Sequence, residues 1–135
     1  MSEILWCADN GDGTYRNPVL YCDYSDPDAI CVNGTYYLTA STFNYVPGLP
    51  ILTSRDLVNW KLLNYAVKNI PEARYAAPQH AQGIWAPAIR FQNGRFYIYY
   101  GMPDEGIYMV STENPLGDWD TPVLVKPGKG LIDPC

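Results

Sequence analysis

Short segments with many apolar residues recur along this chain, and turn residues bound each of these segments. The first group comprises residues 28–32, 35–41, 51–54 and 60–63, and these segments are rich in aromatic and β-branched side chains. Short segments of this composition between turn residues are typical of half-buried β-strands. Since no segment shows a convincing helical period, the pattern predicts an all-β chain.

The same order of strands and turns occurs a second time. Pro27 and Pro87 each precede an Asn-Gly pair by six residues, at Asn33 and Asn93. Each pair favours a tight hairpin turn between two strands. The predicted strands of the second unit are 88–92, 95–100, 107–111 and 123–125. Two units of four short antiparallel strands, about 60 residues apart, are typical of β-propeller blades.

The repeat also suggests how the chain is organised. A third unit opens at Asp133-Pro134, so we expect the first part of a propeller that needs further blades to bury its faces. Two blades do not close a ring, and exposed blade edges predict self-association. The expected parts are a lead-in (1–25), blade one (about 26–63), a connection (64–85), blade two (about 86–126) and the start of blade three (131–135).

Composition and charge exclude several classes of partner. The chain has 47% hydrophobic and 17% charged residues, a net charge of −5 and no cluster of Lys or Arg. Nucleic acid or an anionic membrane would require a basic patch, so neither is expected as a partner. No stretch approaches the roughly 20 apolar residues of a membrane span. Residues 1–6 lack the basic start and apolar core of a signal peptide, which predicts a cytoplasmic location.

The cysteines do not predict a metal site. Cys7, Cys22, Cys31 and Cys135 lack the close spacing of zinc ligands, and His80 is the single histidine. We therefore expect structural or free thiols and no bound metal.

Two aspartates are candidate catalytic residues. Asp26 and Asp133 each stand just before the first strand of a predicted blade, where the blades converge on a central channel. The proline that follows each of them fixes the backbone. Two carboxylates facing one cavity are the usual equipment of glycoside hydrolysis. The alternative is that Asp-Pro only begins a strand. Asp28 also faces the channel by the period of two, unless loop amides satisfy it.

The long connection carries candidate binding residues. Loops of this length inside compact domains are usually functional. Trp85 precedes Ala86-Pro87, the blade-two counterpart of Asp26-Pro27, and is either a platform for a sugar ring or a core residue that seals the hub. His80 either bonds a sugar hydroxyl or is solvated in its loop.

Several motifs in this order resemble glycoside hydrolase family 43. They are Asn17-Pro18-Val19-Leu20, Tyr24-Ser25-Asp26-Pro27-Asp28-Ala29-Ile30, Ser41-Thr42-Phe43 with Pro47-Gly48, Ser54-Arg55-Asp56-Leu57-Val58-Asn59-Trp60, Trp85-Ala86-Pro87 and Leu131-Ile132-Asp133-Pro134. The resemblance covers nearly the whole chain. It is strongest to members that act as β-xylosidases or α-L-arabinofuranosidases on terminal sugars of plant-derived oligosaccharides.

The resemblance implies a five-bladed propeller and an inverting mechanism with three acidic residues. It makes Asp26 the general base and Asp133 the residue that orients the general acid and tunes its pKa. The general acid is a Glu of a later blade that no Glu here matches, so the chain alone is expected to be inactive. Phe43 and Tyr45 match positions that wall the sugar pocket, although core packing would also explain them. Some members bind an axial calcium ion, for which no ligand can be assigned here, and no other cofactor is implied.

Two other functions remain open at this point. A retaining five-bladed enzyme of the invertase-like fructosidase type carries an Asp nucleophile in an Asn-Asp-Pro motif, whereas Ser25 precedes Asp26 here. The anomer of the product would separate the two mechanisms. A non-catalytic propeller that binds sugars or proteins would not need an Asp at both Asp-Pro starts.

Overall fold

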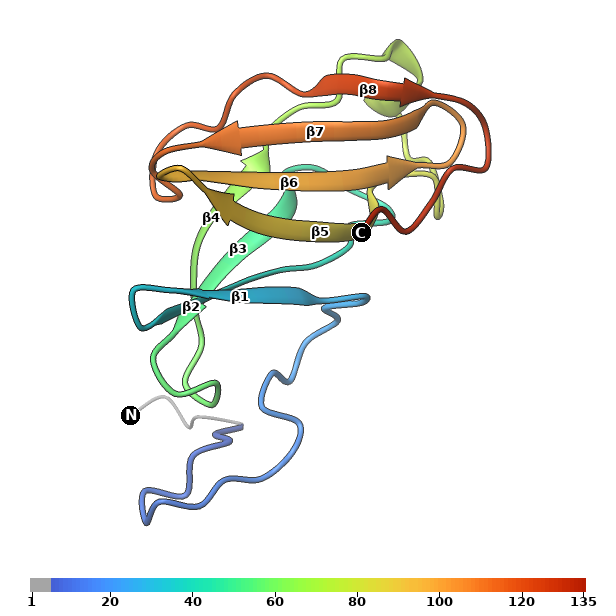
Figure 1. The fold of residues 1–135 in the computed structure, drawn as a ribbon. Helices are drawn as coiled ribbons and strands as arrows, with labels where there is room; N and C mark the ends of the chain where they lie inside the picture. Colours follow the sequence, from blue (N-terminus) through green and yellow to red (C-terminus); the bar gives the residue numbers. More distant parts are fainter. Residues whose placement is uncertain (1–5) are drawn as a thin grey trace.

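The structure is a computed structural model that describes residues 6–135, and it contains two four-stranded antiparallel sheets (Figure 1). Each sheet keeps its strands in chain order, β1-β2-β3-β4 and β5-β6-β7-β8. The strands are β1 (Asp28–Val32), β2 (Thr35–Thr39), β3 (Gly48–Ser54), β4 (Lys61–Val67), β5 (Trp85–Gln92), β6 (Arg95–Met102), β7 (Gly106–Thr112) and β8 (Val123–Pro127). A short 3-10 helix, η1 (Ala73–Ala76), lies in the connection between the sheets. The predicted all-β fold is confirmed.

The two Asn-Gly pairs form the predicted hairpin turns. Asn33 and Asn93 both have a φ of 50°, and the glycines after them have φ values of 73° and 78°. Positive φ at both central residues is the requirement of a type I′ turn, which matches the twist of the flanking strands. The pairs Val32↔Thr35 and Gln92↔Arg95 close the two hairpins.

The outer half of the first sheet is longer than the sequence predicts. The sequence predicts strands at 51–54 and 60–63, yet β3 already begins at Gly48, and β4 continues to Val67. Pro50 is tolerated because the pairing of β2 with β3 ends at Leu52, so the missing N–H of Pro50 faces no β2 partner. Pro50 pairs only with Tyr65 on β4.

One hydrophobic core joins the two sheets. Leu49, Ile51 and Val67 of the first sheet share a buried cluster with residues of the second, such as Ile89 and Ile98. β1 and β5 lie next to each other (Figure 1). The two sheets therefore form one packed unit, in which the innermost strands are neighbours.

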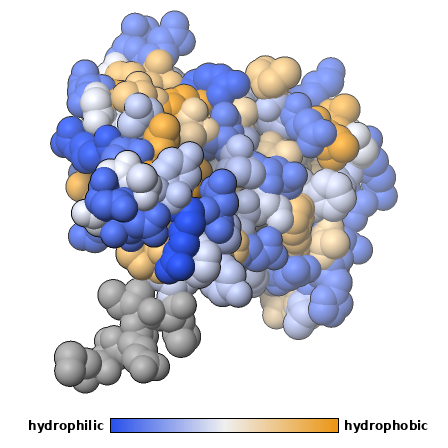
Figure 2. All heavy atoms as spheres, turned by 90° about the horizontal axis from the view of Figure 1, so that it is seen from below, coloured by the Kyte–Doolittle hydropathy of each residue, from blue (hydrophilic) through white to orange (hydrophobic). Residues whose placement is uncertain are grey.

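The outer strand of the second sheet is solvent-exposed along its length. Every residue of β8 is exposed, including Val123, Leu124 and Val125. On the face seen from below, apolar residues occur as separate patches among hydrophilic ones (Figure 2). Exposed edges of this kind are the basis of the expected self-association, which stays a prediction.

The cysteines and the helix content bear on two further predictions from the sequence. Cys7, Cys22, Cys31 and Cys135 are all free and exposed. Within residues 6–135, the structure has no helix of the length and hydrophobicity needed to cross a bilayer.

A core substitution tests the packing of the second sheet. Ile98 is 0% exposed, so Ile98→Ala should lower the free energy of unfolding by about 2–5 kcal/mol through lost contacts and a cavity. Urea unfolding followed by tryptophan fluorescence measures the loss. Leu116→Ala is the control because Leu116 is 64% exposed, and its change should stay within about 0.5 kcal/mol. Equal effects of the two changes would contradict the described core.

Candidate active site

Three residues in equivalent positions share an unusual backbone conformation. Asp26, Ala86 and Asp133 have φ values of 48°, 35° and 53°, and each precedes a proline. The left-handed region is unfavourable for residues with a Cβ, and a following proline disfavours helical backbone further. Such residues cost on the order of 1–3 kcal/mol each and concentrate at functional sites. The repeat therefore carries the same strained element three times.

A buried hydroxyl holds the carboxylate of Asp26. Ser41 Oγ donates to Asp26 Oδ2 at 2.8 Å and accepts from the Ala86 N–H at 2.8 Å. The backbone N–H of Ser41 donates to Ser25 O at 2.9 Å. Ser41 is buried, whereas Asp26 is exposed. One carboxylate oxygen is thus fixed while the residue stays open to solvent.

The backbone before Asp133 lies at the end of the second sheet where β5 begins and β6 ends. Gly101 occupies the place in the second sheet that Ser41 has in the first, and it pairs with Trp85. A Cβ on Gly101 would lie 3.2 Å from Leu131 O and 3.3 Å from Ile132 Cα. The chain before Asp133 therefore passes directly over the end of β6, and the C-terminus lies near the start of β5 (Figure 1).

An aromatic wall, defined here as Phe43, Tyr45 and Trp85, stands beside this end of the sheets. The Phe43 and Trp85 rings meet edge to face with centroids 5.6 Å apart, and the Trp85 indole N–H donates to Ala81 O at 3.0 Å. Trp85 is half-buried, so part of its ring remains available for stacking. Tyr45 is 63% exposed.

A tight backbone contact joins the aromatic wall to the connection. Thr42 and Ile84 exchange backbone hydrogen bonds, and the Gly83 N–H donates to Phe43 O at 2.9 Å. A Cβ on Gly83 would lie 2.5 Å from Thr42 O, so only glycine permits this approach. Trp85, which follows directly, is held close to Phe43 for this reason.

His80 and Asp28 differ in what surrounds them. His80 is exposed beside Ala81, whose N–H donates to Asn44 Oδ1 at 2.7 Å. Asp28 Oδ2 accepts from the Ile89 N–H at 2.9 Å and from the Arg90 guanidinium at 2.7 Å. Asp28 is thus satisfied by strand β5 and links the two sheets, which favours the structural alternative for this residue.

The role of Ser41 could not be predicted from the sequence. The available signal was its place in the Ser41-Thr42-Phe43 motif after the second strand, but a hydrogen bond to Asp26 fifteen residues away cannot be read from that motif. The link to Ala86 spans 45 residues and depends on the packing of the sheets.

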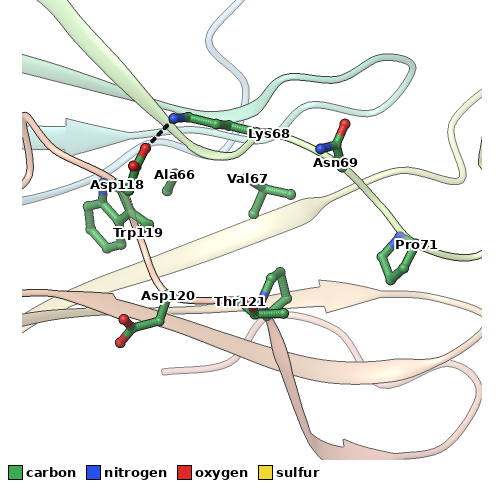
Figure 3. Close-up of a pocket in the computed structure, with 10 residues that line it drawn as sticks. Ala66, Val67, Lys68, Asn69, Pro71, Asp118, Trp119, Asp120 and Thr121 are labelled. Carbon is green, nitrogen blue, oxygen red and sulfur yellow. Dashed lines mark hydrogen bonds and ion pairs between the residues drawn. The ribbon is translucent and has the colours of Figure 1, made fainter.

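A groove of about 330 Å³ lies between the outer parts of the two sheets (Figure 3). The ion pair of Lys68 with Asp118 crosses its edge, and Val67 and Trp119 contribute apolar surface. Trp119 lies in the loop before β8. None of Asp26, Asp133 or the aromatic wall lines this groove, so it is separate from the candidate active site.

Tyrosines and carboxylates form a polar cluster under the connection. Burial, and then the hydrogen bond that its hydroxyl donates to Glu72 Oε1 at 2.9 Å, raise the pKa of Tyr108 to about 12. Burial and the charge of Glu105 raise the pKa of Tyr75, and burial raises that of Tyr100. Among the described residues there is no group of three or more His, Cys, Asp or Glu side chains placed to hold a metal ion.

The family model described as "Glycosyl hydrolases family 43" matches residues 15–135. This chain belongs to glycosyl hydrolase family 43. A protein of Xylanibacter ruminicola is 43% identical over 129 residues, which are 95% of this chain and 24% of that protein. The "Non-reducing end alpha-L-arabinofuranosidase BoGH43B" of Bacteroides ovatus is 38% identical over 96% of this chain and 26% of that protein. The "Beta-xylosidase" of Formosa agariphila is 33% identical over 93% of this chain and 22% of its own length.

Solved family 43 structures share this fold. The crystal structure of the GH43 protein BlXynB from Bacillus licheniformis superposes with a TM-score of 0.77 at 32% sequence identity. The match covers 89% of this chain and 26% of that chain. This family 43 chain therefore spans about a quarter of the length of the relatives it matches.

Removing the hydroxyl of Ser41 tests its bridging role. Ser41→Ala leaves the Ala86 N–H without its acceptor and Asp26 without its donor, so unfolding should become easier by about 1–3 kcal/mol. Ser25→Ala is the matched control because the Ser25 hydroxyl bonds only the exposed Asp23, and it should cost about 0.5 kcal/mol or less. Denaturant titrations compare the two variants, and equal stability of both would refute the bridge.

Alkaline pH should destabilise the chain through its buried tyrosines. The pKa of Tyr108 is about 12 in the folded state against an ordinary value of 10.0. The stability that it contributes is complete below about pH 10 and is lost as the pH rises toward about 12, because the unfolded chain releases the proton first. Tm measured from pH 9 to 12 should fall, and Tyr108→Phe should flatten the fall while Tyr21→Phe, at a 70% exposed residue, leaves it unchanged. A Tm independent of pH over this range would contradict the burial of these hydroxyls.

Proposed function

We propose that the whole protein to which this chain belongs is an inverting glycoside hydrolase that removes terminal xylose or arabinose from plant-derived oligosaccharides. In this proposal its catalytic domain is a five-bladed propeller, of which the chain supplies two blades and the start of a third. The observation that carries the proposal is the carboxylate of Asp26, exposed yet held through one oxygen by the buried Ser41 hydroxyl. The names of the relatives from Bacteroides ovatus and Formosa agariphila support the choice of sugars.

Asp26 acts as the general base in this proposal. Ser41 occupies one carboxylate oxygen, and the other is left to accept a proton from a water molecule that attacks the anomeric carbon. Inversion requires this water to approach from the face opposite the leaving group, where a second, protonated carboxyl donates its proton to the glycosidic oxygen.

The protonated carboxyl belongs to a Glu outside this chain, and Asp133 orients it and tunes its pKa. The left-handed backbone that Asp133 shares with Asp26 supports an equivalent placement at the third blade. Since acid and base act in the same step, residues 1–135 alone should not hydrolyse glycosides.

The aromatic wall would bind the sugar ring. A pyranose or furanose presents C–H groups on its faces, and the half-buried Trp85 ring, braced by Phe43, offers a flat surface for them. The side chains of Tyr45 and His80 are exposed, and both carry groups that can hydrogen-bond sugar hydroxyls.

Substitution of the proposed base tests the function. In the whole protein, Asp26→Asn should lower kcat for aryl xylosides or arabinosides by a factor of about 10²–10⁴ because the amide cannot accept the proton. Tm should change little, since the amide oxygen still accepts from Ser41. Asp23→Asn is the control because Asp23 is an exposed acid three residues earlier, and its kcat should equal that of the wild type.

The stereochemistry of the product separates this mechanism from its rivals. Proton NMR of the first sugar released should show inversion at the anomeric carbon. Retention would favour the fructosidase-like double displacement, and unchanged kcat in Asp26→Asn would remove Asp26 from the mechanism.

A further inference from the structure

One arginine of the connection between the sheets makes two ion pairs with the second sheet. Arg74, on η1, donates to Asp104 Oδ2 at 2.8 Å and forms an ion pair with Glu105, and both acids lie in the turn between β6 and β7. The side chains of Arg74 and Glu105 are 33% and 16% exposed, whereas those of Lys68 and Asp118 are 60% and 87% exposed. The Arg74–Glu105 ion pair is therefore better shielded from solvent than the Lys68–Asp118 ion pair, which also joins the connection to the second sheet.

The same arginine also reaches the segment that precedes Trp85. Its guanidinium lies 3.2 Å from Gln82 Oε1, and the Gln79 side-chain amide donates to Arg74 O at 3.0 Å. The Tyr75 hydroxyl accepts from Arg74 at 2.6 Å and lies 3.0 Å from Gln82 O. Residues 79–82, which include His80, are thus held at both ends by η1.

This segment in turn fixes the aromatic wall. The Trp85 indole N–H donates to Ala81 O, within the segment held by η1. On the other side, Tyr75, Gln79, Phe43 and Tyr45 line a hollow of only about 30 Å³, which has room for about one water molecule. Phe43 and Tyr45 of the aromatic wall thus share a small hollow with Tyr75 of η1.

We propose that Arg74 is a positioning residue for sugar binding, which rests on the proposed function. Its Nη1 atom binds Asp104 and Gln82, and its Nη2 atom binds Glu105 and Tyr75. It thereby transmits the position of the blade-two turn to His80 and the Trp85 ring. A lysine could carry the charge but not these several donors in one plane, so the geometry specifically requires a guanidinium.

Kinetics of the whole protein separate positioning from simple stabilisation. In Arg74→Met, KM for an aryl xyloside or arabinoside should rise about tenfold, because a wall displaced by a fraction of an ångström binds the sugar poorly. The kcat should change much less, because Asp26 is held by Ser41 and not by Arg74. The KM of Arg74→Lys should lie between those of Arg74→Met and the wild type. If Arg74→Met fails to fold, the KM of Arg74→Lys is compared with that of the wild type instead.

Lys68→Met is the matched control, because it removes the Lys68–Asp118 ion pair, which also joins the connection to the second sheet. Its KM should equal that of the wild type. The proposal is overturned if Arg74→Met lowers Tm with KM unchanged, or if Arg74→Lys restores full affinity.

Amide hydrogen exchange provides a readout that does not depend on activity. Exchange in residues 79–85 should become at least several-fold faster in Arg74→Met and stay unchanged in Lys68→Met. If the whole protein hydrolyses neither xylosides nor arabinosides, the proposed function fails, and exchange alone decides whether Arg74 fixes this segment. Unchanged exchange in Arg74→Met would refute the positioning role even in an active enzyme.

Discussion

The candidate active site depends on the backbone that follows each sheet. After the last strand, the chain passes back against the end of the second strand of the same sheet. Residues 84–86 lie against the end of β2, where Thr42 pairs with Ile84 and Ser41 accepts from the Ala86 N–H. Residues 131 and 132 lie against Gly101 at the end of β6 in the same way. Because these returns set where the next unit begins, they place the pre-proline residues at one end of the packed sheets. Ser41 then orients the carboxylate of Asp26, because its hydroxyl bonds both this carboxylate and the Ala86 N–H.

The regular parts of the fold are predictable because their signals are local. Each Asn-Gly pair specifies a hairpin within four residues, and the segments rich in aromatic and β-branched residues on either side become strands. The start of β3 was missed because Pro50 normally interrupts a strand. Its acceptance depends on where β2 stops, which is a fact of pairing between strands.

The site is only partly predictable for the same reason. Asp-Pro at equivalent positions marks Asp26 and Asp133, since the repeat itself is visible in the sequence. Nothing local marks Ser41 as the partner of Ala86, or Arg74 as the partner of Glu105, because the residues of these pairs lie 45 and 31 positions apart. Such contacts exist only after the sheets have packed, so sequence spacing could not show them.

Ala86 has the same strained backbone as Asp26 and Asp133 but no acidic group. The backbone conformation at this position is therefore independent of the side chain that occupies it. A duplicated unit of this kind can place a carboxylate in one copy and a methyl group in the next without refolding. Blade two instead contributes Trp85, immediately before the shared position. Two copies of one unit can in this way present different side chains at equivalent positions, a carboxylate in one copy and an aromatic ring beside a methyl group in the other.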